Sequence, residues 1–180
     1  MQTAQLKSRT LVLYLTLCVI SPTTSALPYD ENVHFSGTLV GEVCTLRPGD
    51  ESISVDFGEI YNNYLFKNGR SPSQPFQLHL LGCDLSIGKQ LSVSFSGNES
   101  SVLPGLLAVI PNNSGIAVGI EDAGGKAIAL NSGSKEITLE NEDMTLKFAA
   151  WIQGEPQAIK AHSIPGGKFS AVATFRLDYL

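Results

Sequence analysis

The side chains that most often carry catalysis are few in this sequence. Three histidines, His34, His79 and His162, stand far apart, and none belongs to an HExxH zinc motif. The sequence also has no GxSxG nucleophile motif, no glycine-rich phosphate loop and no EF-hand loop. We interpret His34 and His79 as surface side chains, because both fall on the outward parity of their predicted strands, and the acidic run 140–143 as a solvated turn. We therefore expect no enzyme, no catalytic residue, no metal site and no cofactor.

The first 26 residues have the pattern of a secretory signal peptide. Lys7 and Arg9 precede an uncharged stretch, Leu11–Ile20, and the small residues 24–26 follow in the spacing of a cleavage site. The alternative is a membrane anchor, but ten residues rise only about 15 Å as a helix, roughly half the hydrocarbon core. We expect cleavage after Ala26, export of the chain and no membrane insertion of the mature part.

Three cysteines remain to be assigned. Cys18 lies in the expected signal peptide, which leaves Cys44 and Cys83 as an even pair in an oxidising compartment. We expect a disulfide between them, closing a loop of about 40 residues that contributes on the order of 4 kcal/mol in the chain-entropy model. The alternatives are two free buried thiols or, with still less support, a metal site, since neither cysteine has a CxxC or Cys/His neighbour.

Composition limits the class of protein further. The 180 residues are 43% hydrophobic, enough to bury a core and to exclude intrinsic disorder as the main state. The formal net charge is −5 and the sequence pI is about 5.1, so we expect no nucleic-acid partner. Seventeen glycines and nine prolines favour short strands joined by many turns over a helical bundle.

Short segments with strand-like alternation recur along the chain between turn signals. The predicted strands are Val33–Thr45, Ser52–Phe57, Pro75–Leu81, Leu91–Phe95, Gly115–Ile120, Ala127–Leu130, Glu136–Leu139, Met144–Ile152 and Lys168–Leu180. No window of 12 or more residues predicts an amphipathic helix, although 58–67 has room for one short turn. We expect a single all-β domain, an antiparallel sandwich of Greek-key type.

The two ends of the exported chain have unusual patterns. The last strand places six side chains on one face without a polar interruption: Phe169, Ala171, Ala173, Phe175, Leu177 and Tyr179. Near the other end, Leu27, Tyr29, Val33 and Phe35 share one parity, and Glu31 interrupts them. A terminal segment of alternating large side chains, and a sheet without a last partner, indicate strand exchange between molecules. The alternative, which fits the pattern equally well, is that 27–35 forms the domain's own edge strand.

Taken together, these features resemble a known family, the chaperone–usher fimbrial subunits that build type 1 and P pili of Gram-negative bacteria. VHFSGTLVGEVCTL (33–46) is similar to the region where such pilins begin their first strand and place their first cysteine. PFQLHLLGCDL (75–85) resembles the strand that leads into their second cysteine. The family also has a penultimate aromatic residue and a glycine fourteenth from the end, which here are Tyr179 and Gly167.

The resemblance implies an incomplete immunoglobulin-like sandwich that lacks its last strand and is completed by donor-strand exchange. Its domains would be a signal peptide (1–26), a donor extension (27–35) and a pilin domain (36–180). The donor residues would be Leu27, Tyr29, Glu31, Val33 and Phe35. The acceptor groove and chaperone-binding strand would comprise Gly167, Phe169, Ala171, Ala173, Phe175, Leu177, Tyr179 and Leu180.

The resemblance also implies partners and a location. These are neighbouring pilin subunits, a periplasmic chaperone that holds the Leu180 carboxylate with basic residues, and an outer-membrane usher. The chain would pass through the periplasm to a surface fimbria that contributes to adhesion. Its length leaves no room for a receptor-binding domain in front of the pilin domain, so we expect a minor or structural subunit and not a two-domain adhesin.

One residue departs from the family pattern. Donor strands of the family usually have a small residue at a central inward position, and here that place falls on Glu31. A buried unpaired carboxylate is costly, so either the register differs or Glu31 meets a polar position.

The alternative function is a free-standing secreted binding module for a glycan or protein. Tyr61 and Tyr64 would offer it aromatic platforms, whereas we interpret Trp151 as a core residue.

Overall fold

The computed structural model describes residues 41–112 and 114–180, which form eight strands and two short helices. In chain order these elements are β1 (Thr45–Leu46), α1 (Asn62–Asn68), β2 (Gln74–Leu81), β3 (Gln90–Gly97), β4 (Leu107–Ala108), β5 (Ile116–Asp122), β6 (Ser134–Thr138), β7 (Met144–Gly154), α2 (Pro156–Lys160) and β8 (Ala173–Tyr179). Neither of the two helices in this part of the chain has the length and apolar character that a membrane crossing requires.

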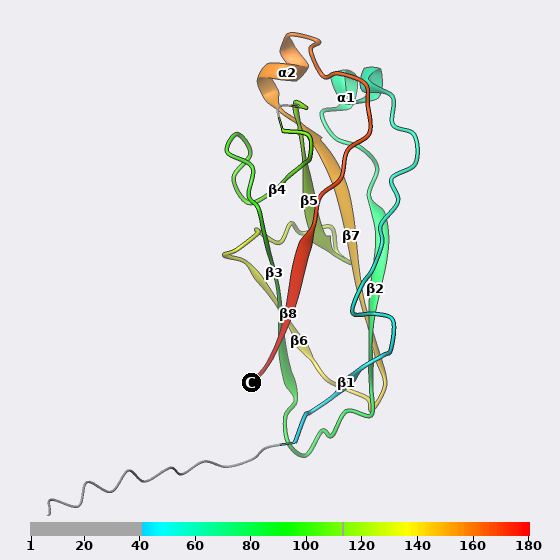
Figure 1. Cartoon of the computed structure of the whole chain (residues 1–180). Helices are drawn as coiled ribbons and strands as arrows, with labels where there is room; N and C mark the ends of the chain where they lie inside the picture. Colours follow the sequence, from blue (N-terminus) through cyan, green and yellow to red (C-terminus); the bar gives the residue numbers. More distant parts are fainter. Residues whose placement is uncertain (1–40, 113) are drawn as a thin grey trace, which may run out of the picture. The chain divides into compact units, whose positions relative to one another are not determined.

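The strands form two antiparallel sheets that face each other (Figure 1). One sheet has the order β1-β2-β7-β5-β4, and the other has the order β6-β3-β8. Strands distant in sequence are neighbours, as where β2 pairs with β7 and β3 with β8. This crossing of connections between two sheets is the Greek-key arrangement, so the expected immunoglobulin-like sandwich is confirmed.

Alternation along the strands explains the core between the sheets. Inward side chains of β2 and β3 are buried while their sequence neighbours are not, as the period of two requires. The most deeply buried large side chains are Leu78, Leu80, Leu91, Val93 and Ile152. The rings of Phe76, Phe95 and Phe148 pack on one another with centroids 5.3–6.1 Å apart.

The disulfide is present between Cys44 and Cys83, as predicted. It fastens the segment before β1 to the connection between β2 and β3. The Asp84 amide donates to the Val43 carbonyl beside it at 2.7 Å. The disulfide thus closes one end of the sandwich.

Several predicted elements differ from the observed ones. Ser52–Phe57 and Ala127–Leu130 are not strands, and the last strand begins at Ala173, five residues later than predicted. The short turn expected within 58–67 is α1, whose C-cap residue Gly69 has a positive φ of 78°. Helix α2 was not predicted, although it begins with Pro156 at its first turn, where the missing N–H costs nothing.

Some sequence predictions lie outside the described residues. These are the signal peptide (1–26), the donor residues Leu27, Tyr29, Glu31, Val33 and Phe35, and the surface position of His34. The boundaries predicted for the pilin domain, 36–180, remain predictions.

Candidate functional site

Strand β8 lies at the edge of its sheet and pairs on one side only. Its partner is β3, from Leu91 opposite Tyr179 to Gly97 opposite Ala173. Strand β3 itself has β6 on its other side, whereas no described strand continues the ladder beyond β8. The backbone N–H and C=O groups along that edge of β8 are therefore available for another strand.

Side chains on the inner face show the same incompleteness. In β3, the inward residues Leu91, Val93 and Phe95 are buried. Directly opposite them on the same face, Tyr179, Leu177 and Phe175 of β8 are only partly buried. The difference follows from position, because β3 is covered by neighbours on both sides and β8 is not.

The inward side chains of β8 and of the segment before it form one row, which packs against the core but is not fully buried. This row comprises Phe169, Ala171, Ala173, Phe175, Leu177 and Tyr179, all of intermediate exposure. They are six of the eight residues predicted for the acceptor groove. The other two, Gly167 and Leu180, are exposed at either end of the row.

A second partly buried row belongs to the segment predicted as a strand at 52–57. Ile53, Val55 and Phe57 pack against the core, while the residues between them are exposed. The ring of Phe57 lies 6.0 Å from that of Phe169, so the two rows meet at the start of the β8 segment. This alternation without ladder pairing indicates a strand whose partner is missing.

Polar contacts mark the far end of β8. The Leu180 amide donates to the Gln90 carbonyl at 2.9 Å, which holds the chain in register to its last residue. Burial, with a further contribution from the Glu42 carboxylate, raises the pKa of Tyr179 above its ordinary value. The outward face carries an exposed ion pair between Arg176 and Asp178 at 2.8 Å.

A buried carboxylate beside β2 was missed by sequence reasoning. Asp50 accepts a hydrogen bond from the His79 amide at 2.6 Å, lies 2.8 Å from the His79 ring Nδ1, and accepts another from Arg47 at 2.8 Å. Burial, the largest single influence, raises its pKa, but the hydrogen bonds from His79 and Arg47 together lower it to about 2. His79 does lie on the outward face of β2, as predicted, but it is partly buried there because it is the partner of Asp50. The RPGD sequence at 47–50 indicated a turn but not its contact with His79.

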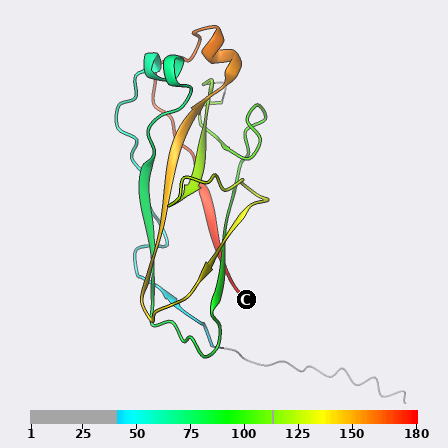
Figure 2. The same cartoon turned by 180° about the vertical axis from the view of Figure 1, so that it is seen from behind.

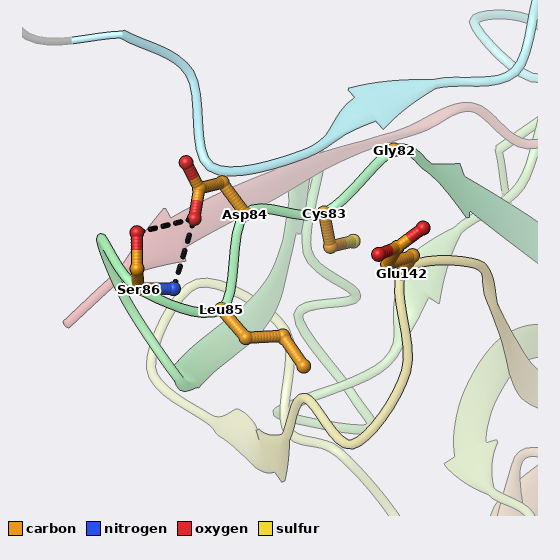
Figure 3. Close-up of a pocket in the computed structure, with 6 residues that line it drawn as sticks. All are labelled: Gly82, Cys83, Asp84, Leu85, Ser86 and Glu142. Atoms are coloured by element: carbon orange, nitrogen blue, oxygen red, sulfur yellow. Dashed lines mark hydrogen bonds between the residues drawn. The ribbon is translucent and has the colours of Figure 1, made fainter.

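Other possible sites offer less. A hollow beside the disulfide is lined by Gly82, Cys83, Asp84, Leu85, Ser86 and Glu142 (Figure 3). Within the described residues, no three histidine, cysteine, aspartate or glutamate side chains gather in a way that would hold a metal ion. Trp151 is buried, as predicted, with the Arg70 guanidinium 4.3 Å above its ring.

Comparison with known proteins identifies similar chains. The sequence model of a family described as "Fimbrial protein" matches residues 33–180. The Major MR/P fimbria protein of Proteus mirabilis (strain HI4320) is 35% identical over 179 residues, covering 97% of this chain and 99% of that protein. Fimbria A protein of Serratia marcescens is 34% identical over 147 residues, covering 82% of this chain and 83% of that protein.

The fold also matches solved structures. The P pilus rod subunit PapA superimposes with a TM-score of 0.67 at 22% identity, covering 77% of this chain and 100% of that one. This similarity concerns the fold.

Proposed function

Because the chain belongs to the fimbrial protein family, and is thus a structural subunit of a chaperone–usher surface fimbria, we propose that the free edge of β8 is where it accepts a strand from the next subunit. Members of this family are structural subunits, and an open strand edge suits a subunit that assembles with others. The relatives reported above are fimbrial proteins, so the alternative of a free-standing binding module gains no support.

One observation carries this proposal. On a shared face, the inward residues of β3 are buried and those directly opposite on β8 are only partly buried. A strand laid along β8 would pair with its free backbone groups and would also cover the inward row. Its inward side chains would meet Phe175 and Leu177 from one sheet, and Val55 and Phe57 from the other side.

The segment that we propose as the donor is residues 27–35 of the following subunit. Leu27, Tyr29, Val33 and Phe35 alternate as the inward row requires. Burying four large apolar side chains would contribute roughly 6–12 kcal/mol before the cost of ordering the strand. In this register Glu31 also points inward, where a carboxylate would reject any groove that offers no polar partner.

Assembly would begin before the subunit joins the fibre. We propose that a periplasmic chaperone first occupies the same edge and that an outer-membrane usher exchanges it for the donor strand. The exposed C-terminal Leu180 would present its carboxylate to basic residues of the chaperone. The Cys44–Cys83 disulfide would brace the sandwich while the edge waits for its strand.

The test compares three secreted proteins. One is residues 36–180 alone. The second is the same chain with its own residues 27–40 appended after Leu180 through a short flexible linker. The third, a matched control, carries Val33→Asp and Phe35→Asp in the appended copy. Oligomeric state and thermal unfolding are measured for each.

We expect the chain without the appended segment to aggregate or melt early. With it, we expect a monomer that unfolds tens of degrees higher, and the control should behave like the chain without the segment. If residues 36–180 alone form a stable monomer that the appended segment does not change, the β8 edge is not a strand-acceptor site.

A further inference from the structure

Strand β8 turns one set of backbone groups toward its free edge, and the hydrogen bonds at its two ends identify that set (Figures 1 and 2). The Leu180 amide donates to the Gln90 carbonyl at 2.9 Å, and the Ser170 amide donates to the Ile110 carbonyl at 3.0 Å. Both are even-numbered residues that bond toward β3 and the chain after β4. Because successive residues of a strand point their backbone groups in opposite directions, the odd-numbered residues present theirs to the free edge.

An added strand would therefore pair with β8 in two alternating ways. Every strand pair in the described residues is antiparallel. We take the donor, residues 27–35 of another copy, to pair in the same way, a step that rests on the proposed function. Opposite an even-numbered residue of β8 the donor would form a non-hydrogen-bonded pair, in which the Cα atoms are only about 4.5 Å apart. The even-numbered side chains lie on the outer face, so side chains of the two strands approach one another most closely there.

Charges are few on the outer face of β8. The Arg176 side chain is 75% exposed, and its Nε lies 2.8 Å from the Asp178 carboxylate on the same strand. Directly opposite these two residues on β3 are Ser94 and Ser92, which carry no charge. The guanidinium therefore has N–H groups left for a second carboxylate on the side from which a donor strand would approach.

The one carboxylate on the outward parity of the donor is Asp30. The possible alignments differ by steps of two residues, because a step of one would turn every inward side chain outward. In one alignment Asp30 lies opposite Arg176, and the two opposite charges attract. A shift of two residues one way places Asp30 opposite Asp178, which repels it, and a shift the other way places it opposite the neutral Thr174. Glu31 faces inward in all three alignments and does not distinguish them.

Side-chain size on the inner face favours the same alignment. The inward row of β8 has two small residues, Ala171 and Ala173, at its start. When Asp30 lies opposite Arg176, Val33 falls opposite Ala173. Phe35 then falls opposite Ala171, so a large donor side chain meets each of the small ones. A shift of two residues toward the end of β8 would instead leave Ala171 without a large partner. Size and charge thus select one register from opposite faces of the strand.

We propose that Arg176 selects the register of the incoming strand by pairing with Asp30 of another copy. In this register His34 would lie opposite Val172 and cover a side chain that is 79% exposed in the described structure. Asp178 would disfavour the shifted alignment by repelling Asp30. Arg176 is then a specificity-determining residue, because a donor strand without an acid at this position would lose the pair.

Cysteine trapping tests the register. A peptide of residues 27–40 with His34→Cys is added, in a glutathione redox buffer, to the full chain carrying Val172→Cys, Ser170→Cys or Thr174→Cys. All three acceptor positions are exposed. We expect the Val172→Cys chain to link at least about tenfold faster than the other two, because a disulfide needs Cα atoms within about 7 Å. A faster link at either of the other positions would overturn the register.

Charge exchange in the Val172→Cys chain tests the role of Arg176. Arg176→Glu should slow the link about fivefold, since an opposite-charge pair becomes a like-charge pair, and the loss should shrink at high salt. A peptide that also carries Asp30→Lys should restore the rate with Arg176→Glu and should be slow with the unchanged Arg176. Lys147→Glu, on an exposed side chain of the other sheet, makes the same change in net charge and should have no effect.

The register and the proposed function fail in different ways. Uptake of the peptide is followed separately, by the fluorescence anisotropy of a dye at its end. Uptake without a preferred link, or with equal linking rates for Arg176→Glu and Lys147→Glu, would overturn the selection by Arg176 and leave strand acceptance intact. Absence of uptake by every chain would overturn strand acceptance itself, and the register with it.

Discussion

Asp50 is the residue where charge and folding are most directly linked in the described structure. Its carboxylate holds the turn at 47–50 against β2 through Arg47 and both the amide and the ring of His79. We expect Asp50→Asn to lower the unfolding temperature at pH 7 by several degrees, because the amide lacks the charge that both partners meet. The measurement is thermal unfolding of the strand-complemented chain, that is, residues 36–180 with residues 27–40 appended after Leu180. Glu51→Gln, at the neighbouring exposed carboxylate, is the control and should change little.

The sign of the pH dependence follows from the pKa of Asp50, which folding lowers from 3.8 to about 2. Above pH 4 the group is ionised in both states, and its full contribution to stability is present. Between pH 4 and pH 2 only the unfolded chain takes up the proton, so this contribution falls with pH. The difference between wild type and Asp50→Asn should therefore shrink over this range. A difference that stays constant down to pH 2 would contradict the assignment.

For single residues, the sequence predicts a role correctly where that role follows from composition or from the residue's inward or outward position in a strand. The pairing of Cys44 with Cys83 follows from counting cysteines in an exported chain, and the burial of Trp151 follows from its apolar neighbours. The contact between Asp50 and His79 does not follow, because 29 residues separate them and only the pairing of β1 with β2 brings them together.

Strand β8 offers a test of the open edge with two neighbouring residues. Phe175 points inward and Arg176 outward on the same strand. In the strand-complemented chain, Phe175→Ala should lower the free energy of unfolding by about 3 kcal/mol, since the ring is then enclosed. Arg176→Ala should change it by less than about 1 kcal/mol, because its ion pair with Asp178 is exposed. Equal effects of the two substitutions, measured by denaturant unfolding, would show that the inward row is not covered by the added strand.

Long strands were predictable where each has its own partner. The patterns at 75–81, 91–95 and 144–152 correspond to β2, β3 and β7, which are paired along their length. The pattern at 52–57 is equally regular, yet these residues join no ladder, because alternation reports which face is buried and not whether a neighbour exists. Helix α2 has only five residues, too few to show a helical period.

At the scale of the whole molecule, residues 41–112 and 114–180 form a sandwich in which no described strand covers the β8 edge, and this property connects its parts. Many short strands with frequent turns predicted two antiparallel sheets, and the resemblance supplied the missing strand. The sequence alone left open whether 27–35 completes its own domain or another. That choice depends on the geometry of a second molecule, which no pattern within one chain encodes.

Such a molecule should depend on its disulfide more before strand exchange than after it. Cys44 and Cys83 are 39 residues apart, and closing this loop contributes roughly 4 kcal/mol by restricting the unfolded chain. We expect Cys44→Ser with Cys83→Ser to unfold residues 36–180 outright, because that chain buries too little to absorb the loss. The strand-complemented chain should stay folded with a lower denaturant midpoint, since the added strand contributes a similar amount. A reductant should reproduce this shift in the wild type and have no effect on the variant. Equal midpoints with and without the bond would mean that the sandwich is stable without its brace, and that the chaperone need only guide the edge and not preserve the fold.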